Sequence, residues 1–438
     1  MKKINVIGGG LAGSEAAYYL AKRGNQVVLY DIKPNSFTPA HSNKNYGELV
    51  CSNSLKSNDI YGNACGLLKE ELRILGSMVI ECADKTSVPA GNALAVNRED
   101  FAQMITDKLR SMPNIEFVSC EVTSIDFSEP TIVATGPLTT NKLSEFIADN
   151  FSSQLYFYDA AAPIVLAESI DMSEAFIADR YGEPGEGDYI NCPIDKEGYL
   201  AFYNELINAK TAPRHNFEED TKVFDGCMPV EIMAKRGVDT LRFGPLKPVG
   251  LTDPRTGRWA YASMQLRKED EYGTMYNIVG FQTNLLFGEQ KRVFSMFPAL
   301  KNAEFLRYGV MHRNTYLNSP LFLDNTLSVK DKPFTYFAGQ ITGVEGYVES
   351  IASGLVAAIA LDRKLKNKEK IEFTDKTVIG ALSEYVTKEN KNFQPMNANF
   401  GILRPLGFRV RQKAEKKRLQ SEISLETVKK IKENIDEY

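Results

Sequence analysis

A run of six residues near the N-terminus, Gly8-Gly9-Gly10-Leu11-Ala12-Gly13, limits the possible folds more than any other feature of the sequence. The apolar run Lys3–Ile7 before it predicts a strand, and the pattern from Ser14 to Arg23 predicts a helix. Between a strand and a helix, glycines allow a tight turn, close approach to a pyrophosphate and close helix packing. The helix N-terminus then offers N–H groups to the phosphates. The run predicts an α/β dinucleotide-binding unit.

An acidic residue after the second predicted strand supports the dinucleotide-binding interpretation. The next predicted strand, Gln26–Tyr30, ends in Asp31, where a carboxylate can accept hydrogen bonds from a ribose 2′-hydroxyl. A glycine turn that serves packing alone is the alternative, and Asp31 favours the dinucleotide.

Two later glycine turns indicate FAD rather than NAD as the resident cofactor. The predicted strand Thr131–Thr135 enters a turn at Gly136, a pattern similar to that of two-dinucleotide-fold flavoproteins. A further strand, Phe334–Ala338, leads into the turn residues and the predicted helix start, which are Gly339, Gln340, Gly343, Gly346 and Tyr347. A second turn of this kind lets backbone N–H groups approach the flavin end while the first holds the ADP end.

The predicted fold class is therefore α/β, with a Rossmann-like, two-dinucleotide-fold FAD-binding domain that is discontinuous. We predict its first part over 1–150, an inserted α+β substrate or RNA domain over 151–323, and its second part, with a basic helical tail, over 324–438. The middle segment favours short aromatic-rich strands separated by Pro and Gly turns. The tail has clustered Lys and Arg with interspersed acids, which fits either a solvated helix face or an RNA phosphate track.

Charge, cysteine spacing and hydropathy argue against a strongly basic nucleic-acid binder, a zinc protein and a membrane protein. The 438 residues carry a formal charge of −4, so a polyanionic partner would need a local basic surface. The six cysteines form no C-x-x-C pair and show no zinc spacing, which predicts reduced thiols and no metal site. Neither a signal peptide nor a membrane span is predicted, and we expect a cytoplasmic protein without a membrane partner.

One thiol stands out. Cys227 lies between Gly226 and Pro229 in the run Phe224–Glu231, a context that favours an exposed turn. Together with a nucleotide cofactor, such a thiol indicates redox chemistry coupled to covalent catalysis. An inert buried cysteine is the alternative.

These motifs resemble one family over nearly the whole chain, the folate- and FAD-dependent uracil-5 RNA methyltransferases known as TrmFO. The matching runs, in the family's order, are GGGLAGSEAA, TPAHS, ELVCSNSLKSN, VPAGNALAVNRE, VATGPLT, FDGCMPVEIMAKRG, TLRFGPLKPVGLTDPRTG, GVMHRNTYLNSP, FAGQITGVEGYVESIASGL and FQPMNANFG. A more distant resemblance, to the glucose-inhibited division protein A family, covers the flavin parts but not the runs around the two cysteines Cys51 and Cys227.

The resemblance implies a specific chemistry. Uracil carbon 5 is a poor nucleophile until a group adds at carbon 6, and a thiolate suits that reversible addition. By resemblance Cys227 is the candidate nucleophile and Cys51 the second functional thiol, although the two roles could be exchanged. The cofactors implied are FAD, 5,10-methylenetetrahydrofolate as one-carbon donor, and NADPH or NADH as reductant.

Other roles also rest on the resemblance. Tyr347 matches an aromatic that the family places over the isoalloxazine, with a core tyrosine as the alternative. His312, Arg313 and Arg292 are candidate contacts to folate carboxylates or RNA phosphates, and structural ion pairs are equally compatible. His41 is a weaker candidate. The default substrate is the T-loop uridine of tRNA; the alternatives are a uridine of 23S ribosomal RNA and a non-catalytic flavin-bearing RNA-binding scaffold.

Overall fold

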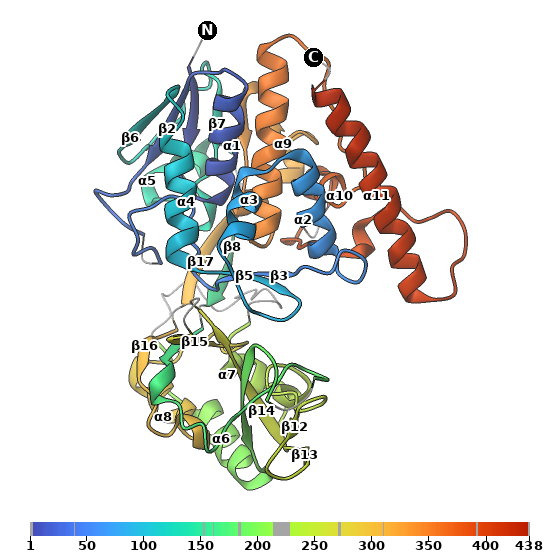
Figure 1. Cartoon of the computed structure of the whole chain (residues 1–438). Helices are drawn as coiled ribbons and strands as arrows, with labels where there is room; N and C mark the ends of the chain where they lie inside the picture. The colour runs from blue at the N-terminus through green and yellow to red at the C-terminus, as the bar shows by residue number, and fades with distance from the viewer. Residues whose placement is uncertain are drawn as a thin grey trace.

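Two lobes joined by a narrow waist make up the molecule (Figure 1). The computed structural model describes residues 3–38, 40–151, 154–160, 162–182, 185–212, 228–269, 273–309, 311–390 and 393–436, with only the backbone for 154–160 and 311–315. Both ends of the described chain lie in the upper lobe, and the lower lobe is formed by the middle of the sequence.

A six-stranded sheet with the order β18-β19-β7-β1-β2-β6 lies at the centre of the upper lobe. Its strands are β1 (Ile4–Ile7), β2 (Val27–Asp31), β6 (Ile115–Ser119), β7 (Thr131–Val133), β18 (Ser328–Val329) and β19 (Lys332–Phe337). The pairs β1–β2, β1–β7, β2–β6 and β7–β19 are parallel. Parallel β7–β19 pairing joins segments about 200 residues apart, so both halves of the chain build one sheet.

The helices of this lobe pack around α1 (Leu11–Lys22) and α9 (Tyr347–Leu365). These two helices touch closely because Gly354 has no side chain: a Cβ there would lie 2.3 Å from the carbonyl oxygen of Ala12. The remaining helices are α2 (Ala64–Leu75), α3 (Met78–Lys85), α4 (Arg98–Arg110), α5 (Asn141–Phe151), α10 (Val378–Thr387) and α11 (Lys413–Asp436). A small antiparallel sheet, β3 (Ser54–Ser57), β5 (Ala93–Val96) and β4 (Ser87–Val88), faces the lower lobe.

Two buried glutamates fasten the helices to one another. The Glu15 carboxylate in α1 accepts hydrogen bonds from the N–H groups of Met78 and Val79 and the Ser77 hydroxyl at the start of α3. Glu71 in α2 accepts from the first N–H groups of α10 in the same way, at 2.7 and 2.9 Å. Each carboxylate satisfies donors that a helix N-terminus leaves unpaired. Burial raises the pKa of both groups to about 7.

The lower lobe is a six-stranded sheet with its own core. Its order is β10-β11-β14-β15-β9-β16, and its pairs are antiparallel. The core rings include Tyr199, Phe202, Phe281 and Phe294. The strands are β9 (Ile164–Leu166), β10 (Phe176–Ile177), β11 (Tyr189–Ile194), β14 (Ala262–Lys268), β15 (Met275–Ile278) and β16 (Phe305–Arg307), with the hairpin β12 (Thr252–Asp253) and β13 (Arg258–Trp259) and the helices α6 (Lys196–Asn208), α7 (Val230–Ala234) and α8 (Phe287–Phe294).

The chain passes between the lobes on two paired strands. Strand β8 (Gln154–Ala160) runs antiparallel to β17 (Met311–Leu317) in the waist. The expected α/β fold with an inserted α+β unit is confirmed. The boundaries at 150 and 323 stay a prediction, although the sheet strands of the lower lobe all fall between Ile164 and Arg307.

The tail, expected to be helical, is helical only in part. Between α10 and α11, residues 393–412 contain only the short turn Phe400–Ile402. Part of this stretch packs beside the start of α9, where the N–H of Glu345 donates to the carbonyl of Met396 at 2.8 Å. Pairing with another segment, together with Pro395 and Pro405, explains why no helix forms there. Over the described residues, no helix combines the length and the apolar character that crossing a membrane requires.

Candidate functional site

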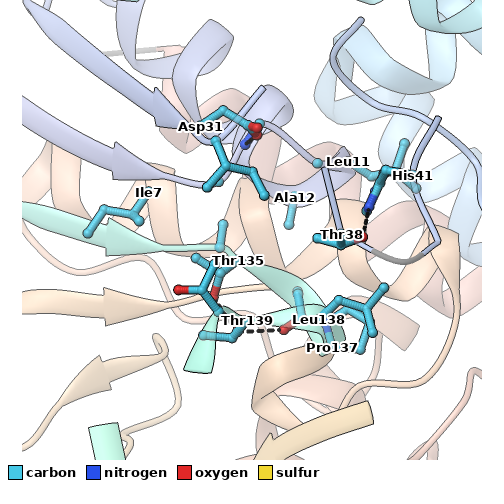
Figure 2. Close-up of a pocket in the computed structure, with 18 of the residues that line it drawn as sticks. Ile7, Leu11, Ala12, Asp31, Thr38, His41, Thr135, Pro137, Leu138 and Thr139 are labelled. Atoms are coloured by element: carbon cyan, nitrogen blue, oxygen red, sulfur yellow. Dashed lines mark hydrogen bonds between the residues drawn. The ribbon is translucent and has the colours of Figure 1, made fainter. Parts of the chain in front are cut away.

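A deep cleft opens at the carboxyl ends of β1, β2 and β7 in the upper lobe. Its empty space, including the part that is open to solvent, is about 1130 Å³. Figure 2 shows Leu11, Ala12 and Asp31 on one side and Thr135, Pro137 and Leu138 on the other. The lining residues come from both ends of the chain, as an extended two-part ligand would require.

The first glycine turn has the geometry predicted from its sequence. Gly8 has a φ of +103°, which favours glycine, and a Cβ on Gly13 would lie 1.8 Å from the carbonyl oxygen of Gly8. A Cβ on Gly10 would instead meet nothing within 4 Å, so the backbone there borders open space in the cleft. Because α1 begins at Leu11 without a side-chain cap, its first N–H groups stay available to an anion.

Asp31 lies beside this turn at the end of β2. Its carboxylate accepts hydrogen bonds from the N–H of Gly9 at 2.6 Å and from the N–H of Lys33 at 2.8 Å. Both Asp31 and Lys33 line the cleft. The predicted ribose acceptor is therefore at the cleft wall and is oriented by the backbone.

Threonines form the opposite wall. Thr135 and Thr139 share a hydrogen bond of 2.6 Å between their hydroxyls, and Thr139 also donates to the carbonyl of Gly136. The buried hydroxyl of Thr140 has no hydrogen-bond partner among the described residues, although it lies at the cleft. A polar ligand in the cleft would satisfy it.

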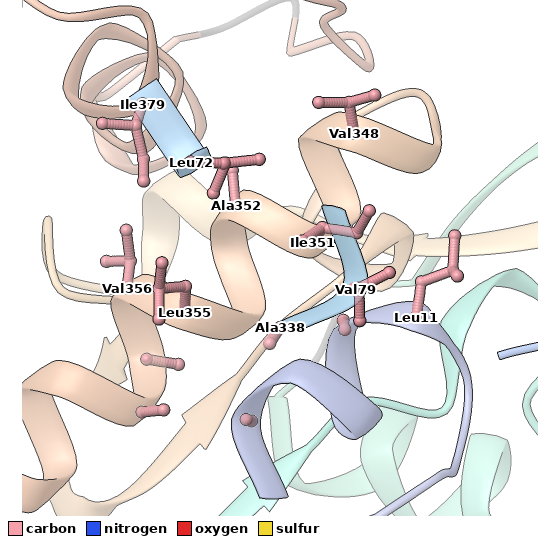
Figure 3. Packing of buried hydrophobic residues seen from close by; sticks show 14 of the residues in the cluster. Leu11, Leu72, Val79, Ala338, Val348, Ile351, Ala352, Leu355, Val356 and Ile379 are labelled. Atoms are coloured by element: carbon pink, nitrogen blue, oxygen red, sulfur yellow. The ribbon is translucent and has the colours of Figure 1, made fainter. Parts of the chain in front are cut away.

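The second glycine turn closes the cleft from the other end of the chain. Gly339, Gln340 and Tyr347 line it, while Gly343 and Gly346 shape the turn from behind. Gly346 has a φ of +124° and begins α9 without a side-chain cap. Figure 3 shows how Val348, Ile351, Ala352, Leu355 and Val356 of α9 pack into the apolar core, which fixes the helix start at the cleft.

Tyr347 connects the cleft to Cys51. Its hydroxyl lies 2.9 Å from the Cys51 Sγ, with either atom able to donate, and accepts from the N–H groups of Cys51 at 2.9 Å and Ser52 at 3.3 Å. Burial and the adjacent Cys51 raise the pKa of Tyr347 well above its usual value, so the phenol stays protonated. Two predicted site residues from distant motifs are thus in direct contact.

Three arginines hold the loop that carries Cys51. Arg98 donates to the carbonyl of Leu49 at 3.2 Å, Arg307 to that of Val50 at 2.9 Å, and Arg267 to the Ser52 hydroxyl at 2.7 Å. Arg307 and Arg267 belong to the lower lobe, so both lobes fix the loop. Arg98 is also paired with buried Glu269, 2.7 Å away. Burial alone would lower the pKa of Arg98, but the Glu269 carboxylate outweighs it and raises that pKa.

No role was predicted for these three arginines. Arg98 lies in VPAGNALAVNRE, one of the runs that resemble the family, and this run is the only sequence feature that points to it. Nothing in the local sequence pattern distinguishes Arg267 or Arg307 from other arginines. Thr140 and Lys33 were missed for the same reason. His41 lines the cleft and contacts the Thr38 hydroxyl at 2.5 Å. Burial, assisted by the charge of Lys33, lowers the pKa of His41, which favours a neutral imidazole.

Four predicted residues are not brought to the cleft by described contacts. Cys227 lies outside the described residues, as do the side chains of His312 and Arg313, whose backbones pair with Asp159 and Tyr158 in the waist. Arg292 is on the surface of α8, in ion pairs with Glu205 and Glu289. These assignments stay predictions, and the contacts of Arg292 match the ion-pair alternative.

The cleft fits a flavin dinucleotide. Two uncapped helix starts and an open glycine face suit a pyrophosphate, Asp31 suits a ribose, and Thr140 needs a polar partner. The residues that would hold FAD are those of the two glycine turns with Asp31, Gly136 and Tyr347. The Cys51 thiol lies next to this cleft, in hydrogen-bond contact with Tyr347.

Comparisons with known proteins agree with this geometry. The family model described as Glucose inhibited division protein A matches residues 3–369. The chain is 55% identical over 99% of both chains to Methylenetetrahydrofolate--tRNA-(uracil-5-)-methyltransferase TrmFO of Acetivibrio thermocellus. It is 56% identical over 98% of both chains to the protein of the same name from Fusobacterium nucleatum.

Solved structures show the same fold. The structure of Aquifex aeolicus GidA in its form II crystal superposes with a TM-score of 0.71 at 16% identity, over 99% of this chain and 73% of that one. The structure of the same protein in its form I crystal superposes with a TM-score of 0.69 at 17% identity, over 99% of this chain and 78% of that one.

Proposed function

Since the chain belongs to the TrmFO family, we propose that it is an FAD- and folate-dependent enzyme that methylates carbon 5 of a uracil in tRNA, giving 5-methyluridine. The contact between Tyr347 and Cys51 is the observation that carries this proposal, because it joins the dinucleotide cleft to a thiol. Relatives more than 50% identical over almost their whole length, named as uracil-5 methyltransferases of tRNA, support it.

FAD is the proposed resident cofactor: the helix start of α1 would hold its pyrophosphate, Asp31 its ribose, and the helix start of α9 its flavin end. Bound FAD supplies the two electrons that take a methylene unit to a methyl group, and 5,10-methylenetetrahydrofolate supplies the carbon. NADPH or NADH is the proposed source of the electrons. Tyr347, which lines the cleft and contacts Cys51, would border the flavin end and orient the Cys51 thiol.

The thiols perform the uracil chemistry. The Cys227 thiolate adds to carbon 6, and carbon 5 then attacks the one-carbon unit, whose bond to its carrier nitrogen breaks as the new carbon–carbon bond forms. Loss of the proton from carbon 5 expels the thiolate from carbon 6 and leaves an exocyclic methylene, which a hydride equivalent from the reductant would convert to the methyl group. Cys51 assists proton removal or shields the reactive centre. Buried thiols such as Cys82, whose pKa burial raises to about 12, are unsuited to this role.

The proposed target is the T-loop uridine of tRNA. The test is methyl incorporation from labelled methylenetetrahydrofolate with FAD and NAD(P)H, using unmodified tRNA and 23S ribosomal RNA in parallel. Label in tRNA at the T-loop position supports the proposal. Label only in ribosomal RNA would move the same chemistry to another substrate, and label in neither, with the flavin reduced, would favour the scaffold.

The same assay tests the thiols. We expect Cys227→Ala to abolish methyl transfer and Cys51→Ala to reduce it strongly, with FAD still bound in both. Cys82→Ala is the control and should retain activity, since that thiol is buried away from the cleft. Normal turnover by Cys227→Ala would refute its assignment as nucleophile.

A further inference from the structure

Three aromatic rings form a parallel stack on the lower lobe. Phe287, the first residue of α8, lies with its ring centroid 4.9 Å from that of Tyr308 at an interplanar angle of 12°. Tyr308 in turn stacks on Phe305 of β16 at 5.6 Å and 5°. We call Phe287, Tyr308 and Phe305 the aromatic platform. In Figure 1, β16 is at the end of the lower lobe that faces the upper lobe.

The outer ring of the platform is exposed to solvent. Phe287 keeps 53% of its surface exposed, and its neighbour Leu286 keeps 41%. Phe305 and Tyr308 are half-buried behind it. Neighbouring exposed apolar side chains offer a candidate binding surface, because their area can still be removed from water by a ligand.

Buried hydrogen bonds hold the platform rigid. The Gln290 amide donates to the carbonyls of Leu285 and Gly309, and its oxygen accepts from the N–H of Gly309 at 2.7 Å. Gln290 is fully buried. Its amide therefore ties the residue after Tyr308 to the turn before Phe287, and a ring held in this way loses little entropy when a ligand stacks on it.

The platform is connected to the loop that carries Cys51 and to the described residues that follow Cys227 in the sequence. Arg307, next to Tyr308, donates to the carbonyl of Val50, the residue before Cys51. The described chain resumes after Cys227 at Met228, and Glu231 accepts from the N–H of Asn284 and the hydroxyl of Thr283 at 2.9 and 2.8 Å. Phe287 follows Asn284 by three residues.

Positive charge adjoins the exposed ring. Lys291 is one helical turn after Phe287 on α8 and is exposed, so the two side chains share a face of the helix. Lys210 is also exposed, and its carbonyl accepts from the N–H of Leu286. An exposed aromatic ring with lysines on the same helix and on the adjoining segment suits a nucleotide, which has a flat base beside a phosphate.

We propose that the aromatic platform stacks a base of the RNA substrate next to the target uridine and so positions that uridine at the loop that carries Cys51. This inference rests on the proposed function, since it names the RNA-binding residues of the same reaction. A uracil attacked at carbon 6 has to leave its base stack, and an aromatic surface beside the site replaces the lost stacking on its neighbour. Folate is less suited to the platform, because it must reach the FAD cleft in the upper lobe.

The test compares four variants at Phe287 and one control. Phe287→Ala and Phe287→Leu remove the ring, Phe287→Tyr and Phe287→Trp keep one, and Phe243→Ala removes a phenylalanine of the same lobe that is 83% exposed. For each holoenzyme we would measure the Kd for unmodified tRNA by fluorescence anisotropy, the KM values for tRNA and methylenetetrahydrofolate, and the flavin absorbance.

We expect the Kd and KM for tRNA to rise about 5- to 100-fold in Phe287→Ala and Phe287→Leu, the range that loss of one base–aromatic stack produces. Phe287→Tyr and Phe287→Trp should stay close to the parent, and bound flavin should be unchanged in every variant. Phe243→Ala should bind tRNA normally.

Two results would overturn the proposal: a tRNA affinity unchanged by Phe287→Ala, or a raised KM for methylenetetrahydrofolate alone, which would assign the platform to folate. The RNA affinity is measured without turnover. A parent protein that binds RNA but transfers no methyl group would therefore refute the proposed function, while the affinities of the variants would still decide the role of the platform.

Discussion

The dinucleotide cleft and the loop that carries Cys51 lie next to each other but are built differently. The cleft is made of backbone: two glycine turns, two helix starts and an acid at the end of a strand. The Cys51 loop is held by long side chains from both lobes, through Arg98, Arg267 and Arg307. Local sequence can specify the first kind of site, whereas the second depends on how the lobes are placed.

Substitutions in the cleft and in the Cys51 loop should therefore have different effects. A change in a glycine turn should affect cofactor binding and leave the contact between the lobes intact. A change in an arginine should disturb the thiol and the junction while the cleft keeps its cofactor. The following predictions are ordered from the largest expected effect to the smallest.

Removal of Arg98 should have the largest effect. Arg98→Ala leaves the Glu269 carboxylate buried without its cation, which costs about 3–5 kcal/mol of folding free energy. Urea unfolding monitored by circular dichroism would measure this loss. The double variant Arg98→Ala/Glu269→Gln removes the unpaired carboxylate and should recover part of the lost folding free energy. Equal stability of the single and double variants would contradict the ion-pair account.

The buried glutamates beneath the cleft predict a pH dependence. Because folding raises the pKa of Glu15 and Glu71 from 4.5 to about 7, their contribution to stability is fully present below pH 4.5 and is lost as the pH rises to about 7. Each contributes on the order of 3 kcal/mol at most. The free energy of unfolding, measured by urea denaturation between pH 4.5 and 7.5, should therefore fall as the pH rises, and we call this decrease per pH unit the pH slope.

Glu15→Gln is the matched variant, since it keeps an acceptor for the start of α3 but does not titrate. It should lose about half of the slope. A slope equal to that of the parent would mean that Glu15 does not titrate in this range.

The glycines of the first turn separate packing from ligand binding. Gly13→Ala places a Cβ against the carbonyl of Gly8 and should cost about 1–3 kcal/mol in folding free energy. Gly10→Ala, whose Cβ meets open space, should leave the stability of the apoprotein unchanged but lower the affinity for FAD. Thermal unfolding of the apoprotein and flavin titration measure the two effects; normal FAD affinity in Gly10→Ala would place the pyrophosphate elsewhere.

Tyr347→Phe should have the smallest effect on folding. It removes the acceptor for the N–H groups of Cys51 and Ser52, which contributes about 0.5–1.5 kcal/mol, and it frees the thiol. We expect slower methyl transfer with FAD still bound, and Tyr385→Phe, at a surface hydroxyl, as the control with normal turnover. An unchanged kcat would show that the contact between Tyr347 and Cys51 does not position the thiol.

By itself, the sequence determined the parts of the molecule that depend on neighbouring residues. The strand, glycine turn and helix at each end of the flavin domain are specified within about twenty residues, because steric limits on φ and the N–H groups of a helix start act locally. Asp31 and Gly339 were predicted at the cleft for this reason, whereas the role of Tyr347 was implied by the family resemblance. The fold class followed from the order of these units.

Only the tertiary structure decided which distant residues meet. Arg98, Arg267 and Arg307 converge on one loop from positions up to about 200 residues apart, and Gln290 ties Phe287 to Tyr308 through a buried amide. The expected helical tail gave way at residues 393–412 to pairing beside α9. The physical reason is that buried charges and amides require partners, and the packing of the whole chain decides which partners lie within reach.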